Sequence, residues 1–334
     1  MYLGRMTCKI RLANKYTLRG VNGIEIKKSV HQIVQTAKVT MALSGVLRNN
    51  DLLEKIKLTD KIKEGDAISL AFGYNGENRE EFTGYIKRIN PKQPLELECE
   101  DEMYLLRKIR LKKAFNKKDV REVLQFIVEA VKAEFGVVIK LYEGIPAVQV
   151  NNFLINGANG IAVLQELSDK YLLSSFLIKV NGELTLYCGL AYGYKSGRVK
   201  HVLNRNTISI DDLKYQMGDD RMFKIEIINN RPDGTVKKYV FGDKKGELTK
   251  ETLPGVVSEA QAKHYADAIL EGLKTASYKG TFETFIFPYA EPGTVSDIID
   301  LQFPARGGAY YIGTVGTSFT VSGGRRKPEI DIRL

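Results

Sequence analysis

Cysteine and histidine are scarce in this chain of 334 residues, which contains three of each. The cysteines lie far apart without a Cys-x-x-Cys motif, so the sequence indicates neither a disulfide framework nor a zinc site. The histidines lie in three separate segments, which gives little support to metal binding or triad catalysis. We expect the cysteines to be reduced and mostly buried thiols. These six residues are Cys8, Cys99, Cys188, His31, His201 and His264.

Long apolar runs are also missing. No segment approaches the roughly 20 apolar residues of a membrane-spanning helix. The N-terminal residues 1–5 lack the apolar stretch of a signal peptide. We therefore expect a protein that is folded in a cytoplasm and has no membrane-spanning segment. The hydrophobic content of 43% is enough to build cores, and the length predicts about two to four domains.

Positive charge is in excess, with 50 Lys and Arg against 40 Asp and Glu. The sequence contains two basic tracts. Each could face nucleic acid or an acidic protein partner, or could be a solvated connector or turn. The larger tract leads into a predicted helix and contains Arg107, Lys108, Arg110, Lys112, Lys113, Lys117, Lys118 and Arg121. The smaller one, near the C-terminus, is typical of an exposed hairpin tip. It reads Gly323-Gly324-Arg325-Arg326-Lys327.

The N-terminal third is rich in β-branched and aromatic residues between short polar turns, which is typical of strands. Asn75-Gly76-Glu77-Asn78 predicts a hairpin turn, because Asn and Gly tolerate positive φ. Five strands with hairpin links predict a small β-barrel over residues 1–110. The expected strands are 24–29, 37–43, 67–72, 81–89 and 95–99.

At Asp119 the spacing of the apolar residues changes from that of strands to that of a helix. Asp119 and Glu122 have the spacing of a capping box. Apolar residues then recur at helical spacing as far as Gly136, which predicts a helix of about four turns. A second helix is expected at 161–172. It is followed by a hairpin around Asn181-Gly182, a dipeptide strongly favoured in tight hairpin turns. Residues 111–210 are therefore expected to form an α+β module.

Strands resume in the last third of the chain. Strands at 223–229 and 235–241 are joined by a turn at 230–234 that contains Pro and Gly. A helix with a small-residue face follows at 258–274, and a strand at 278–287. We predict a second β-barrel over residues 211–334 that carries this helix as a decoration.

A pattern near the N-terminus returns near the C-terminus, and in both copies a strand is followed by a polar loop and a returning strand. With Asp66 set against Asp297, the same face carries apolar residues at period two, as in a half-buried strand. The repeat predicts two related β-barrel domains in a mainly β, α+β fold. Three copies of such a chain would offer six similar units around one axis, which could dock onto a six-fold ring. The matched residues are Ile68, Leu70, Phe72, Tyr85 and Ile86 in the first copy, and Ile299, Leu301, Phe303, Tyr311 and Ile312 in the second.

Residues that could carry chemistry are few. Glu98, Glu100, Asp101 and Glu102 are close in sequence, but no partner acid or base can be identified for them. Residues 157–160, Gly-Ala-Asn-Gly, lack the Lys-Ser/Thr of a phosphate-binding loop and are more typical of a turn with an Asn cap. We expect no catalytic residue, no metal and no cofactor, and hence a protein that is not an enzyme.

An ordered set of segments is similar to the baseplate hub proteins of contractile-tailed phages. This family includes the late control D proteins and the hub portion of type VI secretion spikes. The resemblance rests on residues 62–74, 81–86, 97–101 and 163–167, and on a C-terminal set at 292–293, 303–308, 311–312 and 324–326. It implies a homotrimer whose paired barrels form a pseudo-six-fold ring between the tail tube protein and the central spike protein. The implied location is the virion tail baseplate, assembled in the bacterial host cytoplasm.

Several alternatives remain open at this point. The sequence ends at Leu334 without a lysozyme-like domain or a long spike, so we expect the spike to be a separate polypeptide. A hub of a phage-derived injection machine, such as a tailocin or a type VI-like system, would have the same sequence features. A cell-wall hydrolase and a DNA-binding module are less favoured. A basic lumen would also allow transient contact with DNA passing through the ring.

Overall fold

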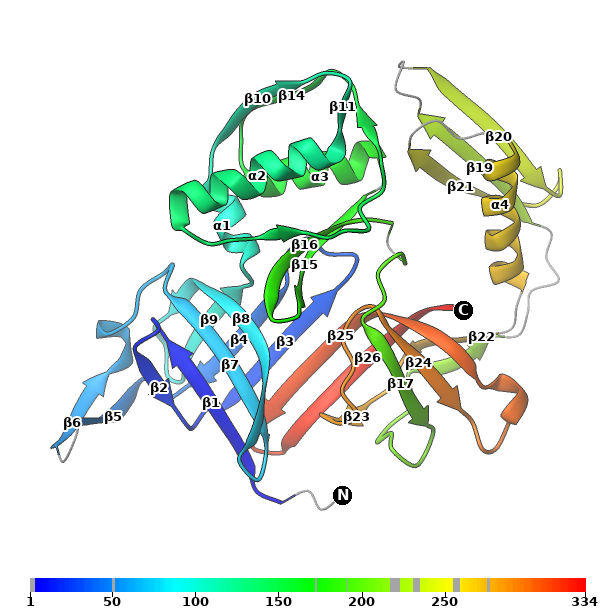
Figure 1. Ribbon diagram of the computed structural model, residues 1–334. Coiled ribbons are helices and arrows are strands. Elements are labelled where there is room, and N and C mark those ends of the chain that lie inside the picture. Colours follow the sequence, from blue (N-terminus) through cyan, green and yellow to red (C-terminus); the bar gives the residue numbers. More distant parts are fainter. Residues whose placement is uncertain are drawn as a thin grey trace.

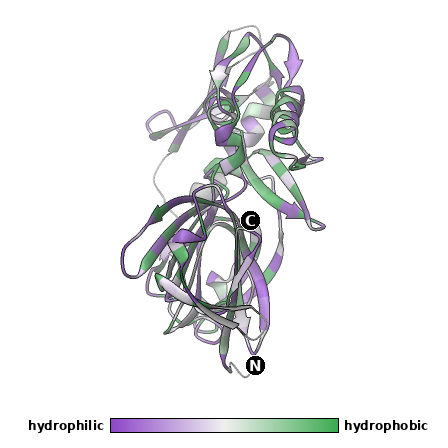
Figure 2. Ribbon diagram, turned by 90° about the vertical axis from the view of Figure 1, so that its left-hand side faces the viewer, coloured by the Kyte–Doolittle hydropathy of each residue, from purple (hydrophilic) through white to green (hydrophobic). Residues whose placement is uncertain are grey.

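The computed structural model describes residues 4–49, 52–171, 173–190, 192–216, 223–230, 235–254, 259–274 and 277–334. Two β-rich halves lie side by side, and an α+β module lies above them (Figure 1). We call residues 4–100 the N-terminal half, residues 101–190 the middle module and residues 192–334 the C-terminal half. Figure 2 shows the β halves as one rounded lobe with the middle module in a second lobe. None of the helices in the described part of the chain has the length and apolar character needed to span a membrane.

The N-terminal half is an antiparallel sheet in the order β3-β4-β9-β8-β7-β1. Alternate residues such as Ile68, Leu70 and Phe72 point into its core and are buried. Its strands are β1 (Met6–Leu12), β3 (Gly23–Ser29), β4 (Thr36–Met41), β7 (Ala67–Tyr74), β8 (Glu77–Asn90) and β9 (Leu95–Glu100). The smaller elements are β2 (Tyr16–Leu18), the β5 (Ser44–Asn49) and β6 (Leu52–Lys57) hairpin, and the 3-10 turn η1 (Leu58–Asp60).

The strands predicted in this half are all present, some with shifted ends. The turn between β7 and β8 also forms as predicted, with positive φ at Asn75 and Gly76. The β5–β6 hairpin was not among the predicted strands, and within the described residues its strands pair only with each other.

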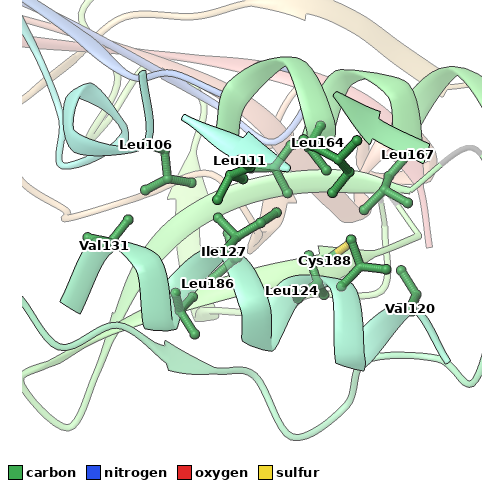
Figure 3. Close-up of a cluster of buried hydrophobic side chains, with 14 of the residues drawn as sticks. Leu106, Leu111, Val120, Leu124, Ile127, Val131, Leu164, Leu167, Leu186 and Cys188 are labelled. Carbon is green, nitrogen blue, oxygen red and sulfur yellow. The ribbon is translucent and has the colours of Figure 1, made fainter. Parts of the chain in front are cut away.

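The middle module packs helices against short strands around one apolar core (Figure 3). Helix α2 (Val120–Phe135) confirms the predicted helix. The Asp119 side chain accepts the Arg121 N–H at 2.8 Å, and Gly136 ends the helix with φ +70°. The other helices are α1 (Met103–Lys108) and α3 (Gly160–Tyr171). The strands are β10 (Leu111–Phe115), β11 (Lys118–Asp119), β12 (Lys140–Leu141), β13 (Gln149–Val150), β14 (Phe153–Ala158), β15 (Ser174–Val180) and β16 (Glu183–Gly189).

The C-terminal half is a second six-stranded sheet, in the order β18-β22-β26-β25-β24-β17. Its strands are β17 (Gly197–Val202), β18 (Leu213–Gln216), β22 (Ser277–Thr281), β24 (Thr294–Ile299), β25 (Gly308–Thr320) and β26 (Gly323–Arg333), with short β23 (Thr284–Phe285) and the 3-10 turn η2 (Pro304–Arg306). A separate layer is inserted between β18 and β22, at the upper right of Figure 1. It consists of β19 (Phe223–Asn230), β20 (Val236–Gly242), β21 (Glu247–Pro254) and helix α4 (Glu259–Lys274).

The two halves have the same strand order. When the six main strands of each half are numbered along the chain, both sheets run 2-3-6-5-4-1. The neighbouring strands are antiparallel in both halves with one exception, since β17 runs parallel to β24 whereas β1 runs antiparallel to β7. The internal duplication predicted from the sequence is therefore present in the topology.

Several boundaries differ from the sequence predictions. Residues 197–202, assigned to the middle module, form β17 in the C-terminal sheet, while α1, assigned to the N-terminal barrel, packs into the core of the middle module. We propose boundaries near residues 101 and 191 in place of 110 and 210. The predicted strand at 278–287 is divided into β22 and β23, and the predicted turn at 230–234 lies almost wholly outside the described residues.

The fold is mainly β with an α+β module, as predicted. Each half is a sheet that encloses an apolar core. Within the described ranges, no ladder joins the outer strands β1 and β3, or β17 and β18. The hydrogen bonds that would close each predicted barrel are therefore not found among these residues.

Candidate assembly surfaces

Among the residues that the structure describes, a single ladder joins the two halves. The second part of β25 pairs antiparallel with β3, from Thr314 opposite Ser29 to Thr320 opposite Gly23. One further bond continues the ladder, in which the Val30 N–H donates to the Gly313 carbonyl at 2.9 Å. The sheets of both halves thus form one continuous sheet of strands that are distant in sequence (Figure 1).

A buried ion pair crosses the same junction. The Arg326 guanidinium on β26 donates to both carboxylate oxygens of Glu81 on β8, at 2.8 and 3.0 Å. Both side chains are almost fully buried, with 2% and 3% exposure. The guanidinium also donates to the Ala290 carbonyl at 3.0 Å and to the Thr317 hydroxyl at 3.2 Å. The geometry satisfies most donors of the buried cation.

The predicted basic tip at the C-terminus is therefore wrong for Arg326. The β25–β26 turn lies at Val321, which is 86% exposed, and Ser322. The run of basic residues lies within strand β26, where the buried Arg326 stands between the partly exposed Arg325 and the exposed Lys327. Arg326 and the buried Ile330 lie on the same face of β26, because side chains alternate at period two along a strand. This pattern was the sequence signal that could have predicted the burial of Arg326.

The two neighbours of Arg326 are bound to carboxylates within the C-terminal half. Arg325 pairs with Glu283 at 3.2 Å and Lys327 pairs with Asp212 at 2.7 Å. These pairs are partly or largely exposed, so both residues stay candidates for contact with a partner.

The larger basic tract follows α1, β10 and the start of α2 on the surface of the middle module. Arg107 is partly buried and donates to both oxygens of Glu100 at 3.1 Å. Lys118 pairs with Glu122 at 3.0 Å, and Lys113 lies 4.8 Å from the centre of the Phe126 ring. Three exposed members make no ion pair, no ring contact and no side-chain hydrogen bond with any described residue. They are Arg110, Lys112 and Lys117.

Lys108 and Arg121 complete the tract. Both are exposed, and Lys108 lies 4.9 Å from the centre of the Tyr104 ring. The Arg121 guanidinium donates to the Glu143 carbonyl at 2.8 Å. The tract is thus largely solvated, and several of its cations are available to a partner.

The acidic group identified in the sequence forms a structural network. Glu100 is bound by Arg107 and by Lys87 at 2.6 Å. Burial raises the pKa of Asp101 well above its usual value, and one of its oxygens accepts the Met103 N–H at 3.2 Å. Burial also raises the pKa of Glu102, which accepts the Thr83 hydroxyl at 2.7 Å. Glu98 accepts the Asn90 amide at 3.0 Å.

The histidines lie in unrelated environments. His31 contacts Asp331 at 2.5 Å, and this hydrogen bond raises the pKa of His31. His201 is buried beside the Ser296 hydroxyl at 2.7 Å, and burial lowers the pKa of His201 to about 4. The His264 side chain lies outside the described residues. In the described part of the chain, no group of three or more His, Cys, Asp and Glu residues could hold a metal ion.

Two smaller predictions are confirmed. The three cysteines are buried and free. The loop before α3 is a turn with an Asn cap, because the Asn159 side chain accepts the Ala162 N–H at 2.9 Å.

The internal repeat can be placed in register by its turns. Gly65 and Gly293 have the same φ of +89°. Their N–H groups donate to the carbonyls of Ile86 and Ile312 respectively, each at 2.8 Å. The returning strands therefore match as predicted, with Tyr85-Ile86 equivalent to Tyr311-Ile312.

The predicted match of the leading strands is wrong by three residues. Counted from the two glycines, Asp66 corresponds to Thr294 and not to Asp297. Side chains alternate at period two, so an odd shift places the wrong face inward. Ile298 is buried, whereas Ile299 is partly exposed, Leu301 is 53% exposed and Phe303 is 49% exposed. The residues equivalent to Ile68, Leu70 and Phe72 are Ser296, Ile298 and Asp300, which are all buried.

The architecture of this chain is similar to that of several solved structures. No protein-family model and no curated protein matches the sequence. Solved structures match along nearly the whole chain. A 43 kDa tail protein of prophage MuSo2 from Shewanella oneidensis is 15% identical, with 98% of both chains covered and a TM-score of 0.63. A tail protein from Neisseria meningitidis MC58 is 12% identical, with 97% of this chain and 96% of that chain covered and a TM-score of 0.61.

A third structure comes from a secretion system. It is a component of the Escherichia coli type VI secretion system, described as similar in structure to tail proteins of bacteriophage T4. It is 14% identical, with 98% of this chain and 77% of that chain covered and a TM-score of 0.58. The resemblance seen in the sequence is thus confirmed at the level of the fold. The chain has the fold that these two tail proteins share with a type VI secretion component.

Proposed function

We propose that this protein is a structural hub of a phage-type tail, in which three copies form a pseudo-six-fold ring between the tail tube and the central spike. The observation that carries the proposal is that both halves have the same strand order and meet edge to edge within one chain. The likeness in fold to tail proteins, one of them from a prophage, supports the same role.

The physical argument is one of symmetry. A ring of identical chains repeats one contact around a closed axis. If the contact between chains resembles the contact between halves, three chains present six similar sheets. Such a ring can face a six-fold tube on one side and a three-fold spike on the other. The partners would be a second and third copy of this chain, a tail tube protein and a spike protein, and the location would be the tail baseplate.

The function needs no chemical step. The carboxylates Glu98, Glu100, Asp101 and Glu102 are used in structural contacts or kept from water, and the solved structures with this fold include tail proteins. We therefore propose that the protein acts by geometry alone.

The mass of the purified protein tests the proposal. Light scattering over a dilution series should give three times the chain mass of 37.5 kDa, and negative-stain images should show rings with six similar lobes. A monomer at every concentration, or a closed ring of another number of copies, would contradict it.

Contact of the basic tract with nucleic acid is a separate part of the proposal. The observation in its favour is that Arg110, Lys112 and Lys117 are exposed and have no recorded ion pair among the described residues. Binding of duplex DNA to the assembled protein should be weak and should fall steeply with salt. The double variant Lys112→Glu and Lys117→Glu should reduce the salt slope and leave the oligomeric mass unchanged. Equal DNA binding by this variant and the wild type would remove the contact.

A further inference from the structure

The duplication assigns a counterpart to each strand at the junction of the two halves. Strands β8 and β25 each carry a β-bulge at the same place, because Ile86 and Ile312 are each followed by one extra residue, Lys87 and Gly313. After the bulge, β25 continues as the edge that pairs with β3. The matching segment of β8 begins at Arg88.

The partner strand β3 also has a counterpart, which is β18. Ile26 of β3 lies opposite Ala37, and Ala37 lies opposite Cys99. In the C-terminal half, Leu213 of β18 lies opposite Gly280, and Gly280 lies opposite Ile330. Cys99 and Ile330 pair with the equivalent residues Ile86 and Ile312. Ile26 therefore corresponds to Leu213.

The residue pairs of the β25–β3 ladder can now be transferred to the counterpart strands β8 and β18. Within the chain, Val315 lies opposite Lys28. Their counterparts are Ile89 and Tyr215. The flanking pairs transfer in the same way, with Arg88 opposite Gln216 and Asn90 opposite Lys214.

Both counterpart edges are open in the single chain. Strand β18 is an end strand of the sheet and its only recorded ladder among the described residues is with β22. After the bulge, β8 also has one ladder among the described residues, which it forms with β9. Open strand edges are ready templates for pairing with another chain.

Backbone polarity at the β8 edge fits this pairing. In the internal junction, the Val30 N–H donates to the Gly313 carbonyl. Because antiparallel pairs alternate, the pair two residues further, Lys28 and Val315, is of the hydrogen-bonded kind. Its counterpart Ile89 must then point its N–H outward. The Ile89 N–H does so, since it donates to the carboxylate of the exposed Glu64 at 3.4 Å.

Backbone polarity at the β18 edge fits as well. The Tyr278 N–H donates to the Tyr310 hydroxyl at 3.2 Å, and the Thr281 N–H donates to the Asp212 carbonyl at 3.4 Å. By the same alternation, Tyr215 and Tyr278 form a pair that is not hydrogen-bonded. The N–H and C=O of Tyr215 therefore point away from β22, toward the open edge.

We propose that residues Arg88–Asn90 of one copy pair antiparallel with residues Lys214–Gln216 of a second copy, with Ile89 opposite Tyr215. This contact repeats between chains what β25 and β3 form within one chain. The inference rests on the proposed ring, which needs a second junction, and it names the strands that form it. Ile89 and Tyr215 are both partly buried apolar residues that pack against the cores of their halves, and pairing them would remove more of this surface from water.

Cysteine cross-linking tests the register. Directly opposed strand residues have Cα atoms about 5.5 Å apart, which suits a disulfide. The three native cysteines are buried, so the engineered pair reports the contact. Under mild oxidation, the double variant Ile89→Cys and Tyr215→Cys should give covalent oligomers that end at three chains. The matched control, Ile89→Cys and Lys214→Cys, places the thiols on opposite faces of the sheet and should give little product.

The outcomes separate this contact from the ring itself. If light scattering gives a trimer but the Ile89 and Tyr215 pair does not cross-link, the contact is wrong and the trimer stands. If the cross-linked ladder continues past three chains, the contact stands and the three-fold ring is wrong. A monomer with no cross-linking would overturn both.

A proline variant gives a second measurement. Ile89→Pro removes the outward N–H, while Ile89→Ala removes similar packing and keeps that N–H. We expect Ile89→Pro to shift the oligomer to monomer at concentrations where Ile89→Ala remains oligomeric. Equal mass for both variants would contradict the proposed hydrogen bond.

Discussion

Arg326 and Glu81 are 245 residues apart in sequence, yet they form a buried ion pair with two hydrogen bonds across the junction of the halves. One comes from β26 and the other from β8, so each half supplies one charge. Removing one partner would leave the other charge buried and unpaired, which is far more costly than losing an exposed pair.

The first prediction concerns this pair. Arg326→Met should lower the free energy of unfolding by about 3 to 5 kcal/mol in urea titrations. Arg325→Met, a neighbouring change at a partly exposed pair with Glu283, should cost less than about 1 kcal/mol. The double variant Glu81→Leu and Arg326→Met should recover much of the loss, because no unpaired charge remains. Equal destabilisation by Arg325→Met and Arg326→Met would be inconsistent with the buried pair.

The corrected register of the repeat gives the second prediction. Ile298 is buried in the core of the C-terminal half, and the adjacent Ile299 is partly exposed. Ile298→Ala should therefore cost about 2 to 5 kcal/mol of unfolding free energy, and Ile299→Ala clearly less. Denaturant unfolding of both variants checks the order. The reverse order would restore the match of Asp66 with Asp297.

The third prediction concerns pH and His31. The hydrogen bond to Asp331 raises the pKa of His31 above its usual value of about 6.5. A histidine with a raised pKa in the folded state contributes stability that is fully present below about pH 6.5 and is lost as pH rises through the raised pKa. The difference in melting temperature between the wild type and His31→Gln should thus be larger at pH 5.5 than at pH 9. A constant difference would argue against the ion pair.

The fourth prediction concerns Asp101, whose contribution to stability changes with pH in the opposite direction to that of a carboxylate with a lowered pKa. Burial raises its pKa well above its ordinary value, so the folded protein favours the protonated form. Its contribution to stability is greatest below about pH 3.9 and declines as pH rises through that value toward the raised pKa. Asp101→Asn cannot ionise, so the variant should gain stability relative to the wild type between pH 4 and pH 7.5. Urea midpoints at several pH values measure this trend, and parallel curves would contradict it.

The fifth prediction compares the two equivalent glycines. Gly65 and Gly293 share the φ of +89°, so alanine is strained at both. At Gly293 an added Cβ would lie 2.6 Å from a Tyr194 ring carbon, whereas at Gly65 its nearest contact is the Tyr104 hydroxyl at 3.4 Å. Gly293→Ala should lower the melting temperature more than Gly65→Ala. Similar values for both would mean that the backbone strain outweighs the clash.

Local patterns predicted the elements well. The cap at Asp119, the stop at Gly136 and the Asn-Gly turn at 181–182 use only neighbouring residues, and all three form as expected. The duplication was also predicted, from the returning Tyr-Ile pairs and from an apolar pattern in the leading strands. The structure matches the returning pairs and adds the equivalent turn glycines Gly65 and Gly293.

Features that depend on distant residues were not predictable in the same way. The buried state of Arg326 depends on Glu81, which belongs to the other half, and a run of basic residues is usually exposed. The strand match failed because polar residues replace apolar ones in the second copy: Ser296 and Asp300 are buried where the first copy has Ile68 and Phe72. An apolar pattern alone therefore favoured a register three residues away.

The covalent link between the halves has a consequence for assembly. The β25–β3 ladder forms between segments of the same molecule, so its effective concentration is set by the chain and does not fall on dilution. An equivalent ladder between separate molecules would depend on their concentration. In the proposed ring of six similar sheets, joining the sheets in pairs leaves half of the junctions to form by collision. Dilution and expression level then act on those junctions alone, while the other half stay formed for as long as each chain is folded.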